Sequence, residues 1–423
     1  MHRPDVIIAN GFDRFLLLIS ATEAEKRGRL DRCIAGFYPT EQMKKRLSML
    51  GLLNQPRIAR LLDRHVALPD DKLTTTPVLE TIGHLGGRVI GDQAVKAARA
   101  AFARKAKSTV LASSAKIYHY RTGYGHCSAA AARQKGMATL ADHTIAHPGV
   151  LAHLVDHQGR LPPQGERGRM APLWVEVMND LRHADRVMVN SAFVKDTFVH
   201  QGWDPERVEV LYQGLDDAFF DLLPQQQAQP TAEAFPDTPL QLVFAGAFEQ
   251  RKGADHVIEA LSVLDDLPWS LDLVGPIDQA MAAKQKNFLD DPRVTVVGRV
   301  DRREMAARLS AADVFLFPSL AEGSARVVFE ALATGCYVIT THNSGSIVED
   351  GVHGALVKPD DPMTTAQALR YAAAHRDQVR QIGIDNAKIV RARYRQADFG
   401  DALMAIYDRL LDAQTLASKR EAA

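Results

Sequence analysis

The sequence predicts an α/β protein built from two Rossmann-like, doubly wound domains in tandem. Three observations lead to this prediction. Apolar β-branched runs alternate with amphipathic segments in both halves, a proline-rich stretch separates the halves, and 423 residues suit two domains. Hydrophobic residues make up 46% of the chain and charged ones 24%, which is typical of soluble globular proteins. Disorder, collagen-like repeats and coiled coil are therefore excluded.

The alternation is clearest from Leu240 onward. Strands are predicted in five short runs, LQLVFAGA, LDLVG, VTVVGRV, VFLFPSL and YVITT, and helices at 254–264, 302–311 and 327–333. Continuous apolar strands with helices between them indicate a parallel sheet covered on both faces. We assign residues 240–395 to this second domain, and residues 396–423 to a last helix that could cross back onto the first domain.

Residues 1–220 show the same alternation less regularly and are assigned to the first domain. Strands are predicted at 6–9, 32–35, 117–120, 137–141, 187–189 and 208–212, and helices at 15–27, 93–110, 128–135, 173–183 and 193–201. Residues 40–90 are predicted to be a helical insertion. The stretch 221–239 contains four of the twenty prolines and four glutamines, so it cannot continue either sheet and is assigned as the linker.

Charge and cysteine content limit the partners and the compartment. The 51 Lys and Arg residues balance 51 Asp and Glu, so no nucleic-acid partner is expected. Three widely spaced cysteines form no CxxC pair, which favours a reducing cytoplasm. No apolar run reaches eighteen residues, so no membrane-spanning helix is expected. The expected location is cytoplasmic, at most peripheral at the inner membrane face.

The stretch 318–335, PSLAEGSARVVFEALATG, is the most informative. A strand ends before it, and a helix is predicted to begin near Arg326. A helix N-terminus attracts phosphate, and small residues let a ligand approach the backbone; here they are Gly323, Ser324 and Ala325.

Two glutamates belong to the same stretch. Glu322 lies on the loop and Glu330 about one turn inside the helix, so both could face one cleft and accept hydrogen bonds from sugar or ribose hydroxyls. On spacing alone, a solvated Glu322 and an ordinary surface pair for Glu330 are equally compatible.

The stretch 243–261 again reads strand, glycine-containing loop, helix, with Arg251 and Lys252 before Gly253. Two cations at a helix entrance are unfavourable unless an anion lies between them, although a plain basic turn is the alternative. Both loops follow strands of one sheet, where open α/β sheets bind ligands. Together they predict a diphosphate site.

The block from Leu240 to about Pro359 resembles the donor domain of retaining glycosyltransferases of the GT-B fold, family 4. Four motifs carry this resemblance in family order: NSAFVKDTF…VEVLYQGLD (190–216), GAFEQRKG (246–253), Glu322-x7-Glu330 and GALVKPD (354–360). The resemblance covers about residues 110–410 well and the first hundred residues weakly. It implies two Rossmann-like domains that face a central cleft.

Site roles follow from the resemblance position by position. It implies that Arg251 and Lys252 bind the donor diphosphate, Glu330 the ribose hydroxyls and Glu322 the hydroxyls of the donor sugar. The backbone of residues 323–325 would line the transferred hexose.

Two positions depart from the family pattern. Ala247 stands where many members carry an Arg, so one expected phosphate cation is missing. Ser324 and Ala325 replace the commoner Phe-Gly pair, which leaves the identity of the donor sugar open.

Six of the fifteen histidines lie between His119 and His157. The pairs 143/147 and 153/157 have the i,i+4 spacing of helical metal ligands. However, the sequence contains no HExxH motif and no nearby Cys, and a proline follows His147. We therefore expect no metal site at these histidines. His143 ends a predicted strand. The resemblance implies a place for it near the transferred sugar, and structural hydrogen bonding is the alternative.

Other first-domain residues are candidates for smaller roles. His119 is expected to be structural, and Arg121, Tyr124 and His126 are acceptor-side candidates. Gly11 follows the first strand, where a glycine lets the backbone approach the donor phosphates across the cleft.

We therefore expect a metal-independent glycosyltransferase of polysaccharide biosynthesis. It would move a hexose, with retention, from a nucleoside diphosphate sugar (UDP or GDP) to a glycan, lipid-linked or small-molecule acceptor. His143, Glu322 and Lys252 are the expected catalytic residues, and no cofactor besides the donor is expected. A nucleotide-sugar epimerase and a non-catalytic sugar-nucleotide binding protein are the alternatives. Residues 41–64 form a basic amphipathic segment able to contact anionic lipid, or else an ordinary solvated helix face.

Overall fold

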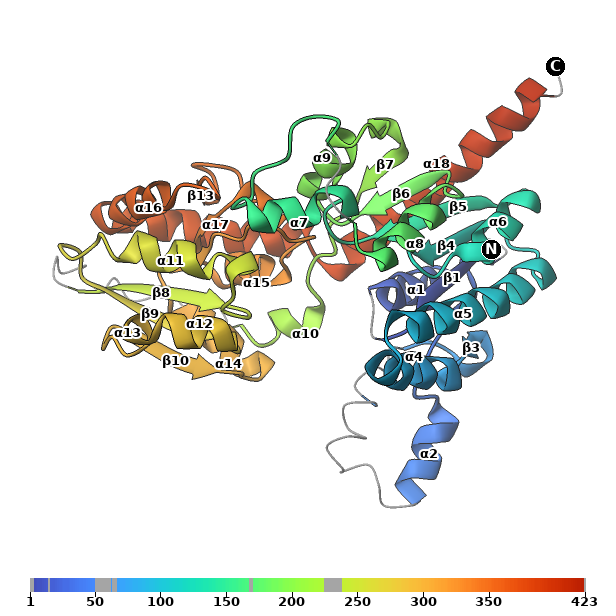
Figure 1. Ribbon diagram of the computed structural model, residues 1–423, viewed down its shortest axis with the longest axis horizontal. Helices are drawn as coiled ribbons and strands as arrows, with labels where there is room; N and C mark the ends of the chain where they lie inside the picture. Colours follow the sequence, from blue (N-terminus) through green and yellow to red (C-terminus); the bar gives the residue numbers. More distant parts are fainter. Residues whose placement is uncertain are drawn as a thin grey trace.

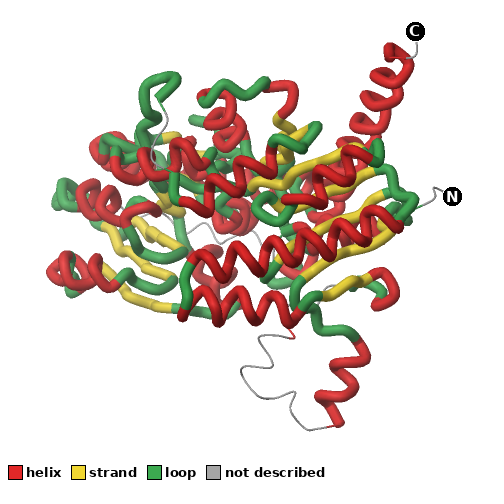
Figure 2. Tube along the Cα trace, turned by 45° about the vertical axis from the view of Figure 1, so that its right-hand side comes forward, coloured by secondary structure: helices red, strands yellow, loops and turns green. Residues whose placement is uncertain are grey.

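The computed structural model describes residues 4–13, 16–49, 62, 67–166, 170–223 and 238–421. Two domains lie side by side along the longest axis (Figure 1), and each is built on one parallel sheet. Figure 2 shows helices packed along the strands of both sheets. Among the described helices, none combines the length and apolar character needed to cross a membrane.

The first domain has a seven-stranded sheet in the order β3-β2-β1-β4-β5-β6-β7. The strands are β1 (Val6–Gly11), β2 (Leu30–Ala35), β3 (Leu73–Thr75), β4 (Ile117–Arg121), β5 (Ala138–His143), β6 (Arg186–Val189) and β7 (Val208–Val210). The helices are α1 (Leu17–Lys26), α2 (Glu41–Met49), α4 (Pro77–Val89), α5 (Asp92–Ala112), α6 (His126–Gln134), α7 (Pro148–Asp156), α8 (Pro172–Leu181), α9 (Ala192–His200) and the short α10 (Asp217–Phe220).

The second domain has a six-stranded sheet in the order β10-β9-β8-β11-β12-β13. The strands are β8 (Leu240–Ala245), β9 (Trp269–Val274), β10 (Val294–Gly298), β11 (Val314–Phe317), β12 (Tyr337–Thr340) and β13 (Gly354–Leu356). The helices are α11 (Ala254–Leu261), α12 (Gln279–Lys284), α13 (Lys286–Leu289), α14 (Arg302–Ala311), α15 (Arg326–Thr334), α16 (Pro362–Ala374) and α17 (Arg376–Arg393), followed by α18 (Gln396–Glu421).

The expected all-helical insertion at residues 40–90 is wrong in one respect. Besides α2 and α4, the described part contains β3, which pairs in parallel with β2 and forms the edge of the first sheet. β3 has three partly buried residues, too few for a two-residue periodicity to show in the sequence. Residues 50–61 and 63–66 lie outside the described part, as do residues 224–237 of the expected linker.

The apolar residues of β1 alternate between the two faces of the first sheet. Ile7 and Ala9 join the cluster that contains Phe102 of α5, whereas Val6 and Ile8 join the cluster on the other face. Helix α18 completes that second cluster with an apolar stripe: Phe399, Leu403, Ile406, Tyr407 and Leu410. The last helix of the chain therefore packs on the first domain.

The chain crosses between the domains twice, and the two crossing segments lie next to each other. Leu215, on the way out of the first domain, forms a parallel bridge with Arg395, which lies on the way back. Beyond this bridge, the Tyr407 hydroxyl lies 2.8 Å from His119 Nδ1, and Arg29 pairs with Asp408 at 2.6 Å. The buried His119 is thus held by α18, as a structural residue would be.

Candidate functional site

Each sheet has one point where the strand order reverses, and open α/β sheets bind ligands at such points. In the second domain the reversal lies between β8 and β11, and in the first between β1 and β4. The loop after β8 leads through a short 3-10 turn (Gln250–Lys252) into α11, and the loop after β11 leads into α15. The sheet order therefore brings the two predicted donor stretches together.

Backbone contacts hold these two loops against each other. The carbonyl of Arg251 accepts hydrogen bonds from the Leu320 amide at 2.9 Å and from the Ser319 hydroxyl at 3.1 Å. Gly253 has a φ of 82°, and a Cβ there would lie 2.1 Å from the Pro318 carbonyl oxygen. Only glycine permits this approach, so Gly253 sets the spacing of the donor loops.

The predicted diphosphate cations and the predicted sugar ligand form one ion cluster. Glu322 Oε1 lies 2.7 Å from Arg251 Nη1 and 3.2 Å from Lys252 Nζ, and Arg251 Nη2 lies 2.9 Å from Glu249 Oε1. The structure thus brings Arg251, Lys252 and Glu322 together as the sequence indicates. It also shows that carboxylates already neutralise both cations, which sequence analysis did not anticipate.

Glu330 belongs to a different ion cluster. Its Oε1 lies 3.3 Å from Arg326 Nε, one helical turn away on α15, and Arg326 Nη2 lies 2.7 Å from Asp216 Oδ2. Burial raises the pKa of Glu330 above its usual value, although Arg326 and Arg302 oppose the shift. The two glutamates therefore have different surroundings and need not respond alike to a ligand.

Asp216 is the centre of this second cluster, and the sequence did not single it out. Both Nη atoms of Arg302 lie 2.7 Å from its two carboxylate oxygens, and its Oδ1 also accepts the amide hydrogen of Phe219 at 3.0 Å to cap α10. Burial alone would raise the pKa of Asp216, but hydrogen bonds from Arg302 and Arg326 lower it to about 2. An Asp before a short helix can be recognised in the sequence as a helix cap. Its pairing with Arg302 and Arg326 cannot be recognised, because the two arginines lie on distant elements.

The segment expected to line the hexose lies where the two domains touch. The carbonyl of Gly323 accepts a hydrogen bond from the Ser191 hydroxyl of the first domain. A Cβ at position 323 would lie 1.8 Å from the Thr144 carbonyl oxygen, and one at Gly345 would lie 2.0 Å from the Gly323 oxygen. Gly323 and Ala325 are buried in this contact, and Ser324 is partly exposed.

His143 lies at the end of β5, immediately before Thr144, and is buried. Its Nδ1 lies 3.1 Å from the Thr122 hydroxyl oxygen, and its ring packs edge-on against Phe198. Burial lowers its pKa to about 4, so the imidazole is neutral at pH 7. The Nε2 atom is buried, and the backbone of Ile145 and Ala146 opposes part of this lowering of the pKa.

The remaining first-domain candidates gather around the β1–β4 reversal. Gly11 has a φ of 78°, and a Cβ there would lie 2.8 Å from the Tyr124 ring, so this glycine is required by packing. The guanidiniums of Arg99 and Arg121 both lie against the Tyr124 ring, 4.8 and 5.1 Å from its centre. Burial lowers the pKa of Arg121, and its Nη1 donates to the Phe12 carbonyl at 2.8 Å.

His126 and the histidine pairs have structural surroundings. The amide of His126 donates to the buried Asp180 at 2.7 Å, and its Nε2 lies 3.8 Å from Glu176 Oε2. The rings of His153 and His157 stack at 3.8 Å, and His147 packs edge-on against Phe198.

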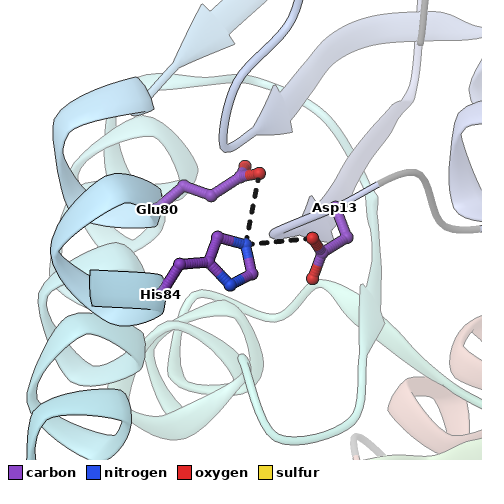
Figure 3. A group of neighbouring side chains, drawn as sticks. All are labelled: Asp13, Glu80 and His84. Carbon is purple, nitrogen blue, oxygen red and sulfur yellow. Dashed lines mark ion pairs between the residues drawn. The ribbon is translucent and has the colours of Figure 1, made fainter. Parts of the chain in front are cut away.

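Three side chains that sequence analysis passed over lie together beside the end of β1 (Figure 3). His84 Nε2 lies 3.0 Å from Asp13 Oδ1 and 3.6 Å from Glu80 Oε1, and Glu80 Oε2 accepts the Phe37 amide hydrogen at 2.6 Å. Their ligand atoms lie within 4.8 Å of one another, close enough to hold a metal ion. The i,i+4 spacing of Glu80 and His84 could have indicated this pair in the sequence. Asp13 could not have been found in that way, because it is distant from both in the chain.

Comparisons with known proteins match both halves of the chain. A model described as Glycosyltransferase Family 4 matches residues 57–219, and one described as Glycosyl transferases group 1 matches residues 239–375. The D-inositol 3-phosphate glycosyltransferase of Xylanimonas cellulosilytica is 32% identical over 44% of this chain and 50% of its own length. That of Mycobacterium ulcerans is 28% identical over 56% of this chain and 53% of its own length. The chain thus spans about half the length of the curated relatives it matches.

Solved structures match over nearly the whole chain. Sucrose-phosphate synthase from Thermosynechococcus elongatus superposes with a TM-score of 0.65 at 19% identity, covering 97% of this chain and all of its own. Anabaena Alr3699/HepE, solved in complex with UDP and glucose, superposes with a TM-score of 0.59 at 17% identity, covering 96% of this chain. This likeness includes both domains and confirms the expected GT-B fold.

Proposed function

The chain belongs to the family 4, group 1 glycosyltransferases, and from this membership we propose that it transfers a hexose from a nucleoside diphosphate sugar to an acceptor. The observation that carries the proposal is the cluster of Arg251, Lys252 and Glu322 on the two loops beside the β8–β11 reversal. It combines cations for a diphosphate with a carboxylate for sugar hydroxyls at the entrance to α15.

Donor binding would exchange partners within this cluster. The diphosphate replaces Glu322 as the partner of Lys252 and of one Arg251 nitrogen, because an anion of higher charge binds the cations more strongly. Glu322 then accepts hydrogen bonds from the sugar hydroxyls, and Glu330 from the ribose.

The same cations would assist the chemical step. As the bond between the sugar and the diphosphate breaks, negative charge grows on the leaving phosphate beside Lys252, Arg251 and the N-terminus of α15. Loss of one such contact costs about 2–4 kcal/mol in the transition state. We infer metal independence from these groups, because they supply the positive charge that a divalent ion would otherwise supply, and we propose no cofactor besides the donor.

Retention of anomeric configuration follows from the family assignment as part of the proposal. The displacement would occur on the face that the leaving group departs from, through an oxocarbenium-like state, with a phosphate oxygen helping to deprotonate the acceptor. The acceptor would enter from the first domain, where His143 ends β5 one residue before Thr144, whose carbonyl lies against Gly323. Acceptors to test are glycans, lipid-linked sugars and small molecules, including inositol phosphate because of the matched relatives' names.

Nucleotide release from a panel of UDP- and GDP-sugars, with and without each acceptor class, tests the proposal. We expect acceptor-dependent release from one donor, unchanged by EDTA, and a product whose anomeric configuration by NMR equals that of the donor. Lys252→Ala should reduce turnover about 30- to 1,000-fold. Lys284→Ala, which removes an exposed lysine paired with Asp255 in the same domain, is the matched control. Release that no acceptor stimulates, or conversion of one nucleotide sugar into another, would reject glycosyl transfer.

A further inference from the structure

Three side chains of the first domain that can each ligate a metal ion converge around His84 Nε2 (Figure 3). Asp13 Oδ1 lies 3.0 Å from this nitrogen, and Glu80 Oε1 lies 3.6 Å from it. Ligand atoms about 2.1 Å from a tetrahedral ion lie roughly 3.4 Å from one another, so both distances have the size that a metal site requires. The Asp13 and His84 side chains are about half exposed, which lets an ion reach the cluster.

The surroundings of Glu80 fix which of its oxygens faces the cluster. The side chain is 5% exposed, and Oε2 accepts the Phe37 amide hydrogen at 2.6 Å. The other oxygen, Oε1, is the one that faces His84 (Figure 3). Gly36 leaves room for the carboxylate, because a Cβ there would lie 1.9 Å from Oε2. Carboxylates that ligate metals are commonly oriented by such an outer hydrogen bond, so Glu80 is arranged as a ligand would be.

Asp13 is held in place by the loop that follows β1. Its backbone has a φ of 64°, a left-handed conformation that Asp and Asn adopt more readily than most residues. Its carbonyl accepts a hydrogen bond at 3.1 Å from Nδ2 of Asn10, which is fully buried. Glu80 and His84 lie one turn apart on the same side of α4. Two separate elements therefore present the three ligands to one point.

The chemistry of the ligand set narrows the choice of ion. One imidazole nitrogen and two carboxylate oxygens are a mixed set, and imidazole suits zinc and its neighbours in the first transition row. Mg²⁺ and Ca²⁺ prefer sites made of oxygen ligands alone. Two carboxylates with a neutral imidazole also balance the charge of a divalent ion. Three protein ligands leave the fourth position of a tetrahedral ion to water.

We propose that Asp13, Glu80 and His84 bind one divalent transition-metal ion, for which Zn²⁺ is the best match to the ligand set. The ion ties the loop after β1 to α4, two segments far apart in the chain, and so stabilises the first domain. The site is separate from Arg251 and Lys252, which lie on the second domain. The inference thus goes beyond the proposed function and does not depend on it.

Titration of the full chain with Zn²⁺, after treatment with EDTA and removal of the chelator, tests the site. We expect a chromophoric chelator to report competition from one tight site per chain. The melting temperature should rise by about 5 °C at a hundredfold excess of Zn²⁺ over its dissociation constant, and Mg²⁺ should have neither effect. His84→Asn and Asp13→Asn should each weaken Zn²⁺ binding at least about tenfold. Both metal-free variants should keep the circular dichroism of the wild type, since Asn tolerates the backbone at position 13.

His157→Ala is the matched control. It removes one ring of the stacked pair with His153, which also has the i,i+4 spacing of helical metal ligands, and it should leave the tight site unchanged. The proposal is overturned if the wild type does not bind Zn²⁺, if both cluster variants bind it as the wild type does, or if His157→Ala abolishes binding. Equal affinity for Mg²⁺ would overturn the choice of ion. None of these measurements reads sugar transfer, so their failure would leave the proposed function untouched.

Discussion

The carboxylate of Glu322 and the guanidinium of Arg251 meet at 2.7 Å across two loops that lie 71 residues apart in the chain. Lys252 shares the same carboxylate oxygen. A diphosphate that binds these cations, as proposed above, would therefore have to compete with an internal anion, and its binding would be coupled to the position of Glu322.

Glu322→Gln should separate binding from turnover. Removing the competing charge should strengthen binding of free UDP or GDP about fivefold, the scale of a partly exposed ion pair, while turnover falls because contacts to the sugar strengthen as positive charge develops there. Calorimetry and transfer rates measure the two effects. Glu304→Gln, which changes an exposed pair with Arg308, is the control, and weaker diphosphate binding by Glu322→Gln would contradict the arrangement.

Glu330→Gln should have opposite effects on binding and stability. Binding of nucleotide sugar and free nucleoside diphosphate should both weaken by about 1.5–3 kcal/mol, because the ribose is common to both ligands. Because the pKa of Glu330 is raised in the folded protein, its protonated form favours folding. This stabilisation is complete below the pKa of the unfolded state and is lost as pH rises through the pKa of the folded state. The variant should therefore unfold at higher urea than wild type at pH 7, and this gain should shrink toward pH 4.5. Loss of nucleotide-sugar binding alone would move Glu330 to the sugar site.

His143 should matter for transfer and leave nucleotide binding unchanged. His143→Gln should lower turnover while calorimetry with free nucleoside diphosphate gives the wild-type affinity. Burial lowers the pKa of His143 to about 4 in the folded protein. The neutral imidazole therefore contributes about 3 kcal/mol to the free energy of unfolding above the pKa of the unfolded state. This contribution is lost as pH falls through about 4. Wild-type turnover in the variant would leave His143 with the structural role alone.

Asp216→Asn should destabilise the protein by about 2 kcal/mol at pH 7, since it leaves Arg302 and Arg326 without their shared carboxylate. The lowered pKa of about 2 means that the wild-type contribution is present above the unfolded pKa and lost as pH falls through 2. Asp217→Asn tests an exposed neighbour paired with Arg395 and should change stability by less than about 0.5 kcal/mol. Equal urea midpoints for the two variants would show that the Asp216 cluster adds no stability.

Gly323→Ala should separate the domains locally. Its Cβ would meet the Thr144 carbonyl oxygen at 1.8 Å, and a backbone atom cannot yield as a flexible side chain can. Small-angle scattering should report a larger radius of gyration and transfer should fall, while Lys252 still binds nucleoside diphosphate. Ser324→Ala, one residue away and partly exposed, should leave the scattering unchanged.

The central strands of both sheets were predictable because they are continuous apolar runs such as Val6–Ala9 and Val314–Phe317. The edge strands β3 and β13 were not, since their three residues, LTT and GAL, include one large apolar side chain each. β7 is equally short and also an edge strand, but its Val208 and Val210 continue into Leu211 and Tyr212 and were recognisable. The pairing of β3 and β13 depends on the finished sheet, which a short sequence window does not contain.

The meeting of the loops after β8 and β11 was predictable, because parallel strands deliver their loops to one edge of a sheet. The pairing of Arg251 and Lys252 with Glu322 was not, since it depends on how two loops orient their side chains toward each other. The cluster of Asp13, Glu80 and His84 could not be predicted for the same reason. These residues meet because α4 packs against Phe12, just after β1, and no local pattern connects Asp13 to a helix so far along the chain.

The position of α18 bears on how the chain is made. The first domain contains residues near the N-terminus, yet one face of its core is closed by Leu403, Ile406 and Tyr407. Domains commonly fold in the order in which the ribosome releases them, but here that face stays uncovered until α18, which follows the second domain in the chain, has been made. The domain that is synthesised first is thus the last to be finished, and the nascent chain must keep an apolar surface open throughout the synthesis of the other domain.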